Sequence, residues 1–188
     1  MNLLSLLHRY LNIPLILAPE VAELFRWEQL EKGDYFLRQG QRLPKLAFLN
    51  SGHLRCWAPA KAKDITQWIF SPTYLVTDLH ALFFEEPARW NIQALETCTL
   101  ATLPAEHYQQ ISKLVPNWES LEKQFLARCF STLEDRVFSF LSLTTRERYA
   151  HLLAYQPELF NTVPLHYLAS MLGMAPETLS RIRREAAS

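Results

Sequence analysis

VPLHYLASMLGMAPETLSRIRRE, residues 163–185, contains the most informative pattern in this chain of 188 residues. Four residues of its first half share the spacing i, i+3, i+4, i+7 of one apolar helix face: Leu165, Leu168, Ala169 and Leu172. Gly173 follows, and glycine is the residue at which helices commonly end. Pro176 suits the first position of a new helix, because the N–H that proline lacks has no partner there, and ETLSRIRREA has high helix propensity. The stretch therefore predicts a helix, a tight turn and a second helix.

The second predicted helix separates into two faces. At 100° per residue, Leu179, Ile182 and Ala186 point inward. The opposite face carries Glu177, Ser180, Arg181 and Arg184, with Thr178 and Arg183 at its flanks. Arginine can donate two hydrogen bonds to guanine, glutamate can accept one from cytosine, and flanking hydroxyls and arginines suit phosphates. The alternative is that Glu177 and Arg181 form only a surface ion pair on a solvated helix.

The same string resembles the helix-turn-helix of the Crp/Fnr family of transcription regulators, especially its short-chain members with the sequence LASxLGxxPETLSRIR. This resemblance implies that Glu177, Ser180 and Arg181 contact DNA bases, and that Thr178, Arg183 and Arg184 contact phosphates or flank the site. Ala175 departs from the family pattern, because many relatives carry a Ser or Thr there, and losing such a helix cap costs about 1 kcal/mol. With little sequence after the second helix, we expect a winged-helix-like domain with a reduced wing.

The N-terminal half has the pattern of a β domain. From Phe25 to about Leu103, short alternating or apolar runs are separated by turn residues, which predicts strands in a sandwich or barrel-like roll. LEKGDYFLRQGQRLPKLAFLNSGHLRCW, residues 30–57, resembles the start of the cyclic-nucleotide-binding β-roll, a double-stranded β-helix. The expected α+β organisation is a β-roll sensor domain at 1–117, a dimerisation helix at 118–143 and a helix-turn-helix domain at 144–188, the last including one further helix from Thr144 to Phe160.

The long predicted helix is apolar over a wide face. Leu121, Phe125, Cys129, Leu133, Val137 and Leu141 repeat every four residues, and five further residues widen the stripe: Trp118, Leu126, Phe130, Phe138 and Phe140. The β domain alone could cover this face. We expect instead that a second copy of the chain covers part of it, which predicts a homodimer.

The effector site of the β-roll departs from the family pattern, which is Phe-Gly-Glu followed by Arg-Ser/Thr-Ala. A cyclic nucleotide needs N–H groups at a glycine turn, a carboxylate for its ribose and an arginine for its phosphate. This chain has Val76-Thr77-Asp78-Leu79 and, later, Ala88-Arg89-Trp90, without the glycine. Asp78 and Arg89 could substitute, although Arg89 is one position out of register. Tyr74 and Trp90 could line a pocket for another small molecule or simply fill the core. We expect no cofactor, no cyclic-nucleotide control and an effector of unknown identity.

Composition excludes several other classes of protein. The 19 Lys and Arg balance the 19 Asp and Glu, so any DNA binding must come from a local surface. The leucine-rich start is interrupted by His8, Arg9, Asn12 and Pro14, which fits neither a signal peptide nor a membrane span and predicts a cytoplasmic protein. Cys56, Cys98 and Cys129 are far apart, as expected of buried free thiols. The isolated His53, His80 and His107 predict no metal site.

These observations together predict a DNA-binding transcription regulator that acts as a homodimer on a palindromic site. The resemblance also implies RNA polymerase as a partner. The chain shows no catalytic constellation or phosphate-binding loop, so we expect it not to be an enzyme. Two alternatives stay open: a ligand-binding or protein-interaction module that keeps the fold without specific DNA binding, and a cupin-like metalloenzyme.

Overall fold

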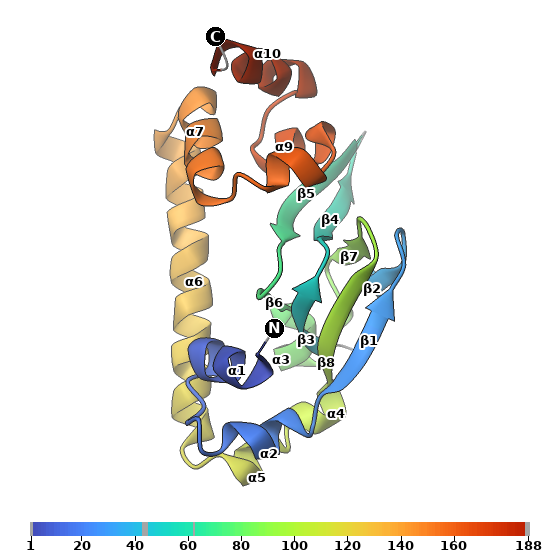
Figure 1. The fold of residues 1–188 in the computed structure, drawn as a ribbon, viewed down its shortest axis with the longest axis vertical. Coiled ribbons are helices and arrows are strands. Elements are labelled where there is room, and N and C mark those ends of the chain that lie inside the picture. Colours follow the sequence, from blue (N-terminus) through green and yellow to red (C-terminus); the bar gives the residue numbers. More distant parts are fainter. Residues whose placement is uncertain (1, 43–44, 62, 187–188) are drawn as a thin grey trace.

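A computed structural model describes residues 2–42, 45–61 and 63–186 of the chain. One long helix, α6, runs along one side of the molecule and the strands lie on the other side (Figure 1). Short helices from the N-terminal part close one end, and the last four helices form the opposite end. The expected α+β fold class is confirmed.

The strands form two four-stranded antiparallel sheets. The strand orders are β1-β8-β3-β6 and β2-β7-β4-β5, with the strands β1 Arg26–Leu30, β2 Tyr35–Leu37, β3 Lys45–Ser51, β4 Leu54–Ala60, β5 Lys63–Phe70, β6 Leu75–Val76, β7 Asn91–Ala94 and β8 Cys98–Pro104. All of these strands lie in the region from Phe25 to about Leu103 that was predicted to form strands, with β8 ending one residue beyond it. Alternate side chains of the sheets point into a shared core that includes Phe36, Leu49, Leu54, Ile92 and Leu100.

Gly52 joins β3 to β4 at a very close approach of the backbone. Its φ is +83°, and a Cβ there would lie 2.6 Å from Cys98 Sγ and 2.7 Å from the carbonyl oxygen of Thr97. Only glycine adopts this conformation without strain and also leaves room for β8. The hairpin between β3 and β4 therefore depends on this residue.

A second core lies between the β domain and the N-terminal helices. Leu3, Leu4, Leu7 and Leu11 are on helix α1 (Leu3–Leu11), as their spacing predicts. Helices α2 (Ala18–Ala22), α4 (Ala105–Tyr108) and α5 (Ile111–Leu114) lie at the same end of the molecule. Their apolar side chains meet Trp118 and Phe125 of α6. This core fixes the N-terminal half of α6 against the β domain.

Helix α6 (Trp118–Ser142) agrees with the predicted 118–143 within one residue. Its two ends differ in what they contact. Trp118 and Phe125 are buried, with Leu121, Leu126 and Cys129 packed around them, whereas the second half carries an exposed apolar stripe. The stripe consists of Phe130, Leu133, Val137 and Leu141, which are 49–81% exposed, with Phe138 beside it at 69%. On a helix of 3.6 residues per turn these four positions span about 80°.

The prediction of a single helix from Thr144 to Phe160 is wrong. This segment is divided into α7 (Thr145–Tyr155) and α8 (Leu159–Thr162). Pro157 explains the break, because proline lacks a helical N–H and disfavours the helical conformation of the residue before it. Gln156 accordingly has φ −142° and ψ 66°. Helix α3 (Leu79–Phe84) and strand β6 were not predicted from sequence.

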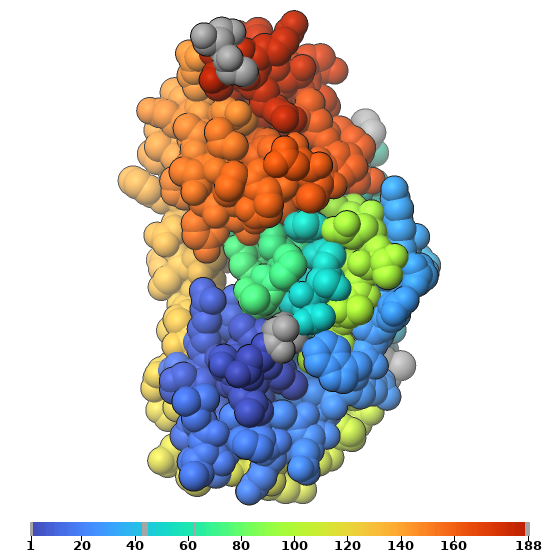
Figure 2. Space-filling model, in the orientation of Figure 1, coloured from blue at the N-terminus to red at the C-terminus, as the bar shows by residue number. Residues whose placement is uncertain are grey.

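Helices α9 (Leu165–Met171) and α10 (Pro176–Ala186) form the predicted helix-turn-helix at the end of the molecule. Their core contains Leu168, Ala169, Leu179 and Ile182, together with Ile69 of β5. Figure 2 shows these C-terminal helices, in orange and red, seated directly against the strands in cyan and green. The C-terminal helices and the β domain thus share a core.

Candidate nucleic-acid interface

The turn between α9 and α10 is a Schellman motif. The N–H of Met174 donates to the carbonyl of Ala169 at 3.0 Å, and the N–H of Gly173 donates to the carbonyl of Ser170 at 3.1 Å. Gly173 has φ +67°, and a Cβ there would lie 2.6 Å from Cε1 of Phe140 on α6. The glycine predicted as a helix stop is therefore needed for the left-handed backbone and for the contact with α6. This turn sets the angle at which α10 follows α9.

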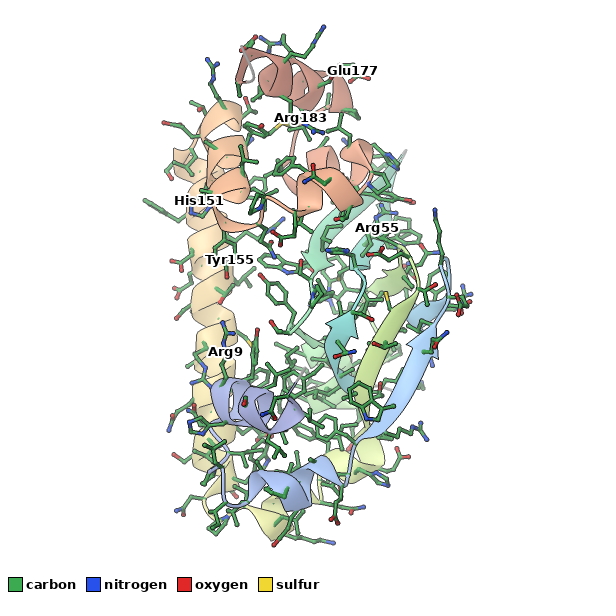
Figure 3. The ribbon with its side chains drawn as sticks, in the orientation of Figure 1. Arg9, Arg55, His151, Tyr155, Glu177 and Arg183 are labelled. Carbon is green, nitrogen blue, oxygen red and sulfur yellow. The ribbon has the colours of Figure 1, made fainter. Side chains whose placement is uncertain are left out.

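The two faces of α10 agree with the helical wheel except at its end. Leu179 and Ile182 are buried, but Ala186, which was predicted to point inward, is exposed. It lies in the last turn of α10, beyond the core that the other helices form. Glu177, Arg181 and Arg184 are exposed and Ser180 and Thr178 are half-buried. The helix lies at the extreme end of the molecule, where Glu177 is open to solvent (Figure 3).

Arg181 pairs with a different carboxylate from the one considered in the sequence. Its Nη1 lies 3.5 Å from Glu185 Oε1, and Glu185 Oε2 lies 3.5 Å from Arg146 Nη2 at the start of α7. Arg181 and Arg146 are 63% and 65% exposed. A surface ion pair of this kind contributes about 0–1 kcal/mol, so either arginine can leave Glu185 at little cost. Arg146 is a cation beside the face of α10 that the sequence did not single out, because it precedes the motif and reaches α10 only through the fold.

Arg183 lies on the inner flank of α10. It is half-buried, and its guanidinium carbon lies 5.7 Å from the ring centroid of Phe160 on α8. Figure 3 shows it on the side of α10 that faces the other C-terminal helices. The outward surface of the helix therefore has its cations at Arg181 and Arg184, and Arg183 also contributes to packing.

The candidate effector residues do not form one site. Asp78 is 2% exposed and caps α3. Its carboxylate accepts hydrogen bonds from the N–H groups of Ala81 (3.2 Å), Arg89 (2.7 Å) and Trp90 (3.3 Å). The bonds from Arg89 and Trp90 bring the two segments of the predicted pocket together. The carboxylate is thereby occupied by the protein's own backbone.

The other candidates point elsewhere. The Arg89 side chain is exposed, with its guanidinium 5.9 Å from the ring of Trp90, and Trp90 packs against the core of the β domain. The Tyr74 hydroxyl accepts a hydrogen bond from Gln156 Nε2 at 2.9 Å, and burial raises the pKa of Tyr74. Tyr74 therefore joins the β domain to the end of α7.

The cysteines and histidines hold local structural contacts. Cys56 and Cys98 are buried free thiols and Cys129 is half-buried. Burial raises the pKa of the Cys56 thiol to about 12. His53 and His80 contact Glu96 and Glu86 at 2.6 and 3.0 Å, and no group of three or more metal-ligating side chains occurs in the described part of the chain.

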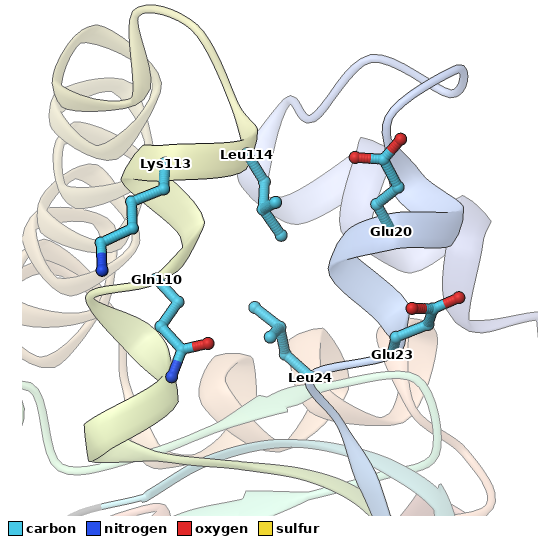
Figure 4. A pocket seen from close by; sticks show the side chains of 6 residues that line it. All are labelled: Glu20, Glu23, Leu24, Gln110, Lys113 and Leu114. Atoms are coloured by element: carbon cyan, nitrogen blue, oxygen red, sulfur yellow. The ribbon is translucent and has the colours of Figure 1, made fainter.

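The surface depressions lie away from these residues. One of about 420 Å³ is bounded by α2 and α5 and lined by Glu20, Glu23, Leu24, Gln110, Lys113 and Leu114 (Figure 4). It is a shallow hollow at the end of the molecule opposite α10, with Glu20 and Glu23 on one side and Lys113 on the other. None of the candidate effector residues contributes to it. No helix within residues 2–42, 45–61 and 63–186 combines the length and the apolar character needed to cross a membrane.

Comparisons with known proteins agree with this architecture. Residues 27–113 match the family model of the cyclic nucleotide-binding domain. A transcriptional regulator of the Crp/Fnr family from Eubacterium rectale superposes with a TM-score of 0.69 at 17% identity, covering 93% of this chain and 83% of that one. FixK2 from Bradyrhizobium japonicum gives a TM-score of 0.69 at 12% identity, covering 86% and 83%.

The catabolite activator protein of Thermus thermophilus gives a TM-score of 0.59 at 22% identity, with coverage of 97% of this chain and 86% of that one. A search of curated proteins by sequence found no match. Two of these three solved structures are named as a catabolite activator protein and a transcriptional regulator. Residues 27–113 are thus similar to the cyclic nucleotide-binding domain, and the chain as a whole has the fold of these three solved structures.

Proposed function

We propose that this chain is a DNA-binding transcription regulator that acts as a homodimer on a palindromic site. The observation that carries the proposal is the outward face of α10. Glu177, Ser180, Arg181 and Arg184 share that face at the exposed end of the molecule, on a helix whose other face is anchored by Leu179 and Ile182. A rigid exposed helix with these side chains suits the major groove, where arginine and glutamate discriminate between base pairs.

The energetics favour an exchange of partners by Arg181. On binding DNA it would leave Glu185, an exposed pair worth about 0–1 kcal/mol, and contact a guanine, which is worth about 1–3 kcal/mol of discrimination. Glu177 can accept from a cytosine N4 amino group. Arg184, with Thr178 and Arg183 at the flanks, supplies contacts to phosphate. Arg146 lies close enough to join them, because it shares Glu185 with Arg181.

The stripe of Phe130, Leu133, Val137 and Leu141 supports the homodimer. These side chains stay 49–81% exposed in the single chain, and burying them against a second copy stabilises by about 25 cal/mol per Å² of apolar surface. Val137→Glu is expected to convert a dimer at micromolar concentration into a monomer in sedimentation. Thr132→Glu is the matched control, because Thr132 is exposed on another side of the same helix. A native chain that sediments as a monomer contradicts the homodimer.

Selection from random duplex DNA tests the function. We expect one palindrome whose half-sites lie about 10 base pairs apart, or a multiple of this, as two-fold symmetry requires. Arg181→Ala is expected to lose about 1–3 kcal/mol of discrimination at one base pair of each half-site. Arg184→Ala is expected to weaken binding to all sequences evenly and to lower its salt dependence. A folded dimer that enriches no sequence contradicts DNA recognition and favours a ligand-binding or protein-interaction module.

The effector domain is proposed to be independent of cyclic nucleotides. The N–H groups of Arg89 and Trp90, which lie in the segment that holds phosphate in the family pattern, donate to Asp78. A phosphate would therefore have to displace a buried carboxylate of the same charge sign. The midpoint of thermal unfolding is expected to stay unchanged when cyclic AMP or cyclic GMP is added. A nucleotide that bound the folded chain would, at a concentration of 100 times its Kd, raise the free energy of unfolding by about 2.7 kcal/mol. RNA polymerase and a small-molecule effector of another kind remain proposed partners.

A further inference from the structure

Helix α9 covers the free edge of a β-sheet. Strand β5 is the outermost strand of its sheet, so one row of its backbone N–H groups has no partner strand. The N–H of Thr66 on this edge donates to Ser170 Oγ of α9 at 2.9 Å. Ile69 of the same strand is buried in the core of the C-terminal helices. The first helix of the helix-turn-helix is thus attached to the β domain by a specific hydrogen bond as well as by apolar contact.

Arg55 is the central residue of this junction. It is 4% exposed, and its Nε donates to Thr66 Oγ1 at 2.9 Å. Its guanidinium carbon lies 4.0 Å from the ring centroid of Tyr167 on α9 and 4.9 Å from that of Trp57. The carboxylate of Asp64 is 4.0 Å away and half exposed. The buried charge is therefore compensated largely by two aromatic faces, one of which belongs to α9. Figure 3 shows Arg55 beside the lower side of α9.

Two further residues, Arg136 and Gln156, join the C-terminal helices to the rest of the molecule. Arg136 of α6 donates to the carbonyl of Met171 at the end of α9, at 2.9 Å, and its guanidinium lies 5.0 Å from the Trp68 ring of β5. Gln156 after α7 donates to Ser71 Oγ at 3.2 Å and to Tyr74 Oη at 2.9 Å. All of these bonds join residues of the same chain. The helix-turn-helix is therefore tied to both the β domain and α6.

We propose that Arg55, Thr66, Tyr167 and Ser170 form a latch that sets the direction of α10 relative to α6, and so selects one spacing between DNA half-sites. The proposal rests on the proposed function. The turn at Gly173 transmits the orientation of α9 to α10, and α6 is the proposed dimer helix. A fixed angle between them places the two copies of α10 at one separation. A released helix-turn-helix would tolerate several separations.

The latch can also open. Burying a guanidinium removes it from water at a large cost, and the aromatic faces, one hydrogen bond and the half-exposed Asp64 carboxylate offset that cost only in part. Desolvation accordingly lowers the pKa of Arg55. When α9 separates from β5, Arg55 regains water and recovers part of this cost. Arg55 is thus a positioning residue that does not itself contact DNA.

The first test measures binding to the selected palindrome and to a duplex whose half-sites are moved apart by five base pairs, about half a turn. The native chain is expected to bind the selected spacing at least about 100-fold more tightly than the altered one. This factor is the contribution of a second half-site with two or more good base contacts. Arg55→Ala should reduce this preference about tenfold, which equals about 1.4 kcal/mol, while binding to a single half-site stays unchanged. Arg55→Lys should not restore it, because lysine lacks the planar fork and the stacking surface.

The second test follows amide hydrogen exchange and does not depend on DNA. In Arg55→Ala the Thr66 amide should exchange at least about tenfold faster, because its bond to Ser170 opens, while Ile182 in the core of the C-terminal helices keeps its protection. Ser170→Ala should give the same changes, with about a threefold loss of spacing preference, since it removes one hydrogen bond. Arg38→Ala is the matched control, because Arg38 stacks on Tyr35 at 3.6 Å but is exposed and does not contact α9.

The outcomes separate the two proposals. An unchanged spacing preference and unchanged Thr66 exchange in both Arg55→Ala and Ser170→Ala overturn the latch. If Arg55→Ala does not fold, Ser170→Ala decides alone, since Ser170 is half-buried and alanine is a good helix former. If the native chain selects no DNA, the proposed function fails, and Thr66 exchange decides whether the junction positions α9.

Discussion

Gly173→Ala tests how the helix-turn-helix is joined to α6. Gly173 has φ +67°, and an L-residue in this left-handed conformation costs about 1–2 kcal/mol. The added Cβ would also lie 2.6 Å from Cε1 and 3.4 Å from Cδ1 of Phe140. The Phe140 ring is 38% exposed, but the guanidinium carbons of Arg136 and Arg148 lie 5.3 and 4.8 Å from its centroid, and displacing it costs about 1–3 kcal/mol. The substitution should therefore lower the free energy of unfolding by about 2–5 kcal/mol. Because domains are stable by only about 5–15 kcal/mol, this is a large fraction of the total.

A double-mutant cycle with Phe140→Ala separates the two causes. Without the ring the clash disappears and only the backbone cost remains, so Gly173→Ala should then cost about 1–2 kcal/mol. The coupling energy between the positions should accordingly be about 1–3 kcal/mol. Gly33→Ala is the matched control, because Gly33 has φ +93° and a Cβ there meets nothing within 4 Å. It should show the backbone cost alone.

Urea denaturation at one fixed protein concentration measures all four free energies of the cycle, with circular dichroism as the signal. The slope of the free energy against urea should stay constant across the variants, which shows that they unfold from equally compact states. If Gly173→Ala costs the same with and without Phe140, the proposed contact between the turn and α6 is refuted. If it costs less than Gly33→Ala, the left-handed backbone at the turn is refuted as well.

Three further predictions concern single positions. Ala175→Ser should raise the free energy of unfolding in urea by about 1 kcal/mol, because serine can cap α10, and no gain would show that the first turn is already satisfied. Asp78→Ala should lower the free energy of unfolding by at least about 2 kcal/mol, since three N–H groups lose their acceptor. Asp78→Asn should cause a smaller loss, and equal stability of Asp78→Ala and the native chain would contradict these bonds. The free energy of unfolding should fall as the pH rises from 9.0, the ordinary pKa of a thiol, towards about 12, the pKa of Cys56 in the folded state. The folded state favours the neutral thiol, so this contribution to stability is complete below pH 9 and is lost progressively above it. Cys56→Ala should make this fall in a pH series of urea midpoints smaller, and an unchanged fall would assign it to other groups.

Much of the fold was predictable because its signals are local. The bounds of α6, α9 and α10 follow from apolar periodicity and from Gly173 and Pro176. The break at Pro157 also had a local signal, but the apolar spacing on both sides suggested one helix. Strand β6 has two residues and pairs with β3 at Ala47 and Phe48, so too little sequence was available to predict it.

The candidate interface was only partly predictable. The wheel placed Glu177, Arg181 and Arg184 outward, since the face of a helix depends on its period alone. It did not place Arg183 over Phe160 or Glu185 between Arg181 and Arg146, because Phe160 and Arg146 lie on other helices. The sequence proposed Asp78 as a ligand-binding carboxylate, whereas the structure shows it bound to N–H groups of its own chain. The residue type of Asp78 alone did not determine whether its carboxylate is available to a ligand.

The sequence by itself determined the helix-turn-helix, the β domain before it and the long apolar helix between them, because periodicity, glycine turns and proline positions act over a few residues. Only the tertiary structure decided how these parts are joined. Arg55 reaches Tyr167, Thr66 reaches Ser170 and Arg136 reaches Met171 across long separations in the chain. Such contacts depend on which surfaces pack together, and a buried arginine between two aromatic rings has no local sequence signature. The orientation of the exposed helix α10 is therefore a property of the fold.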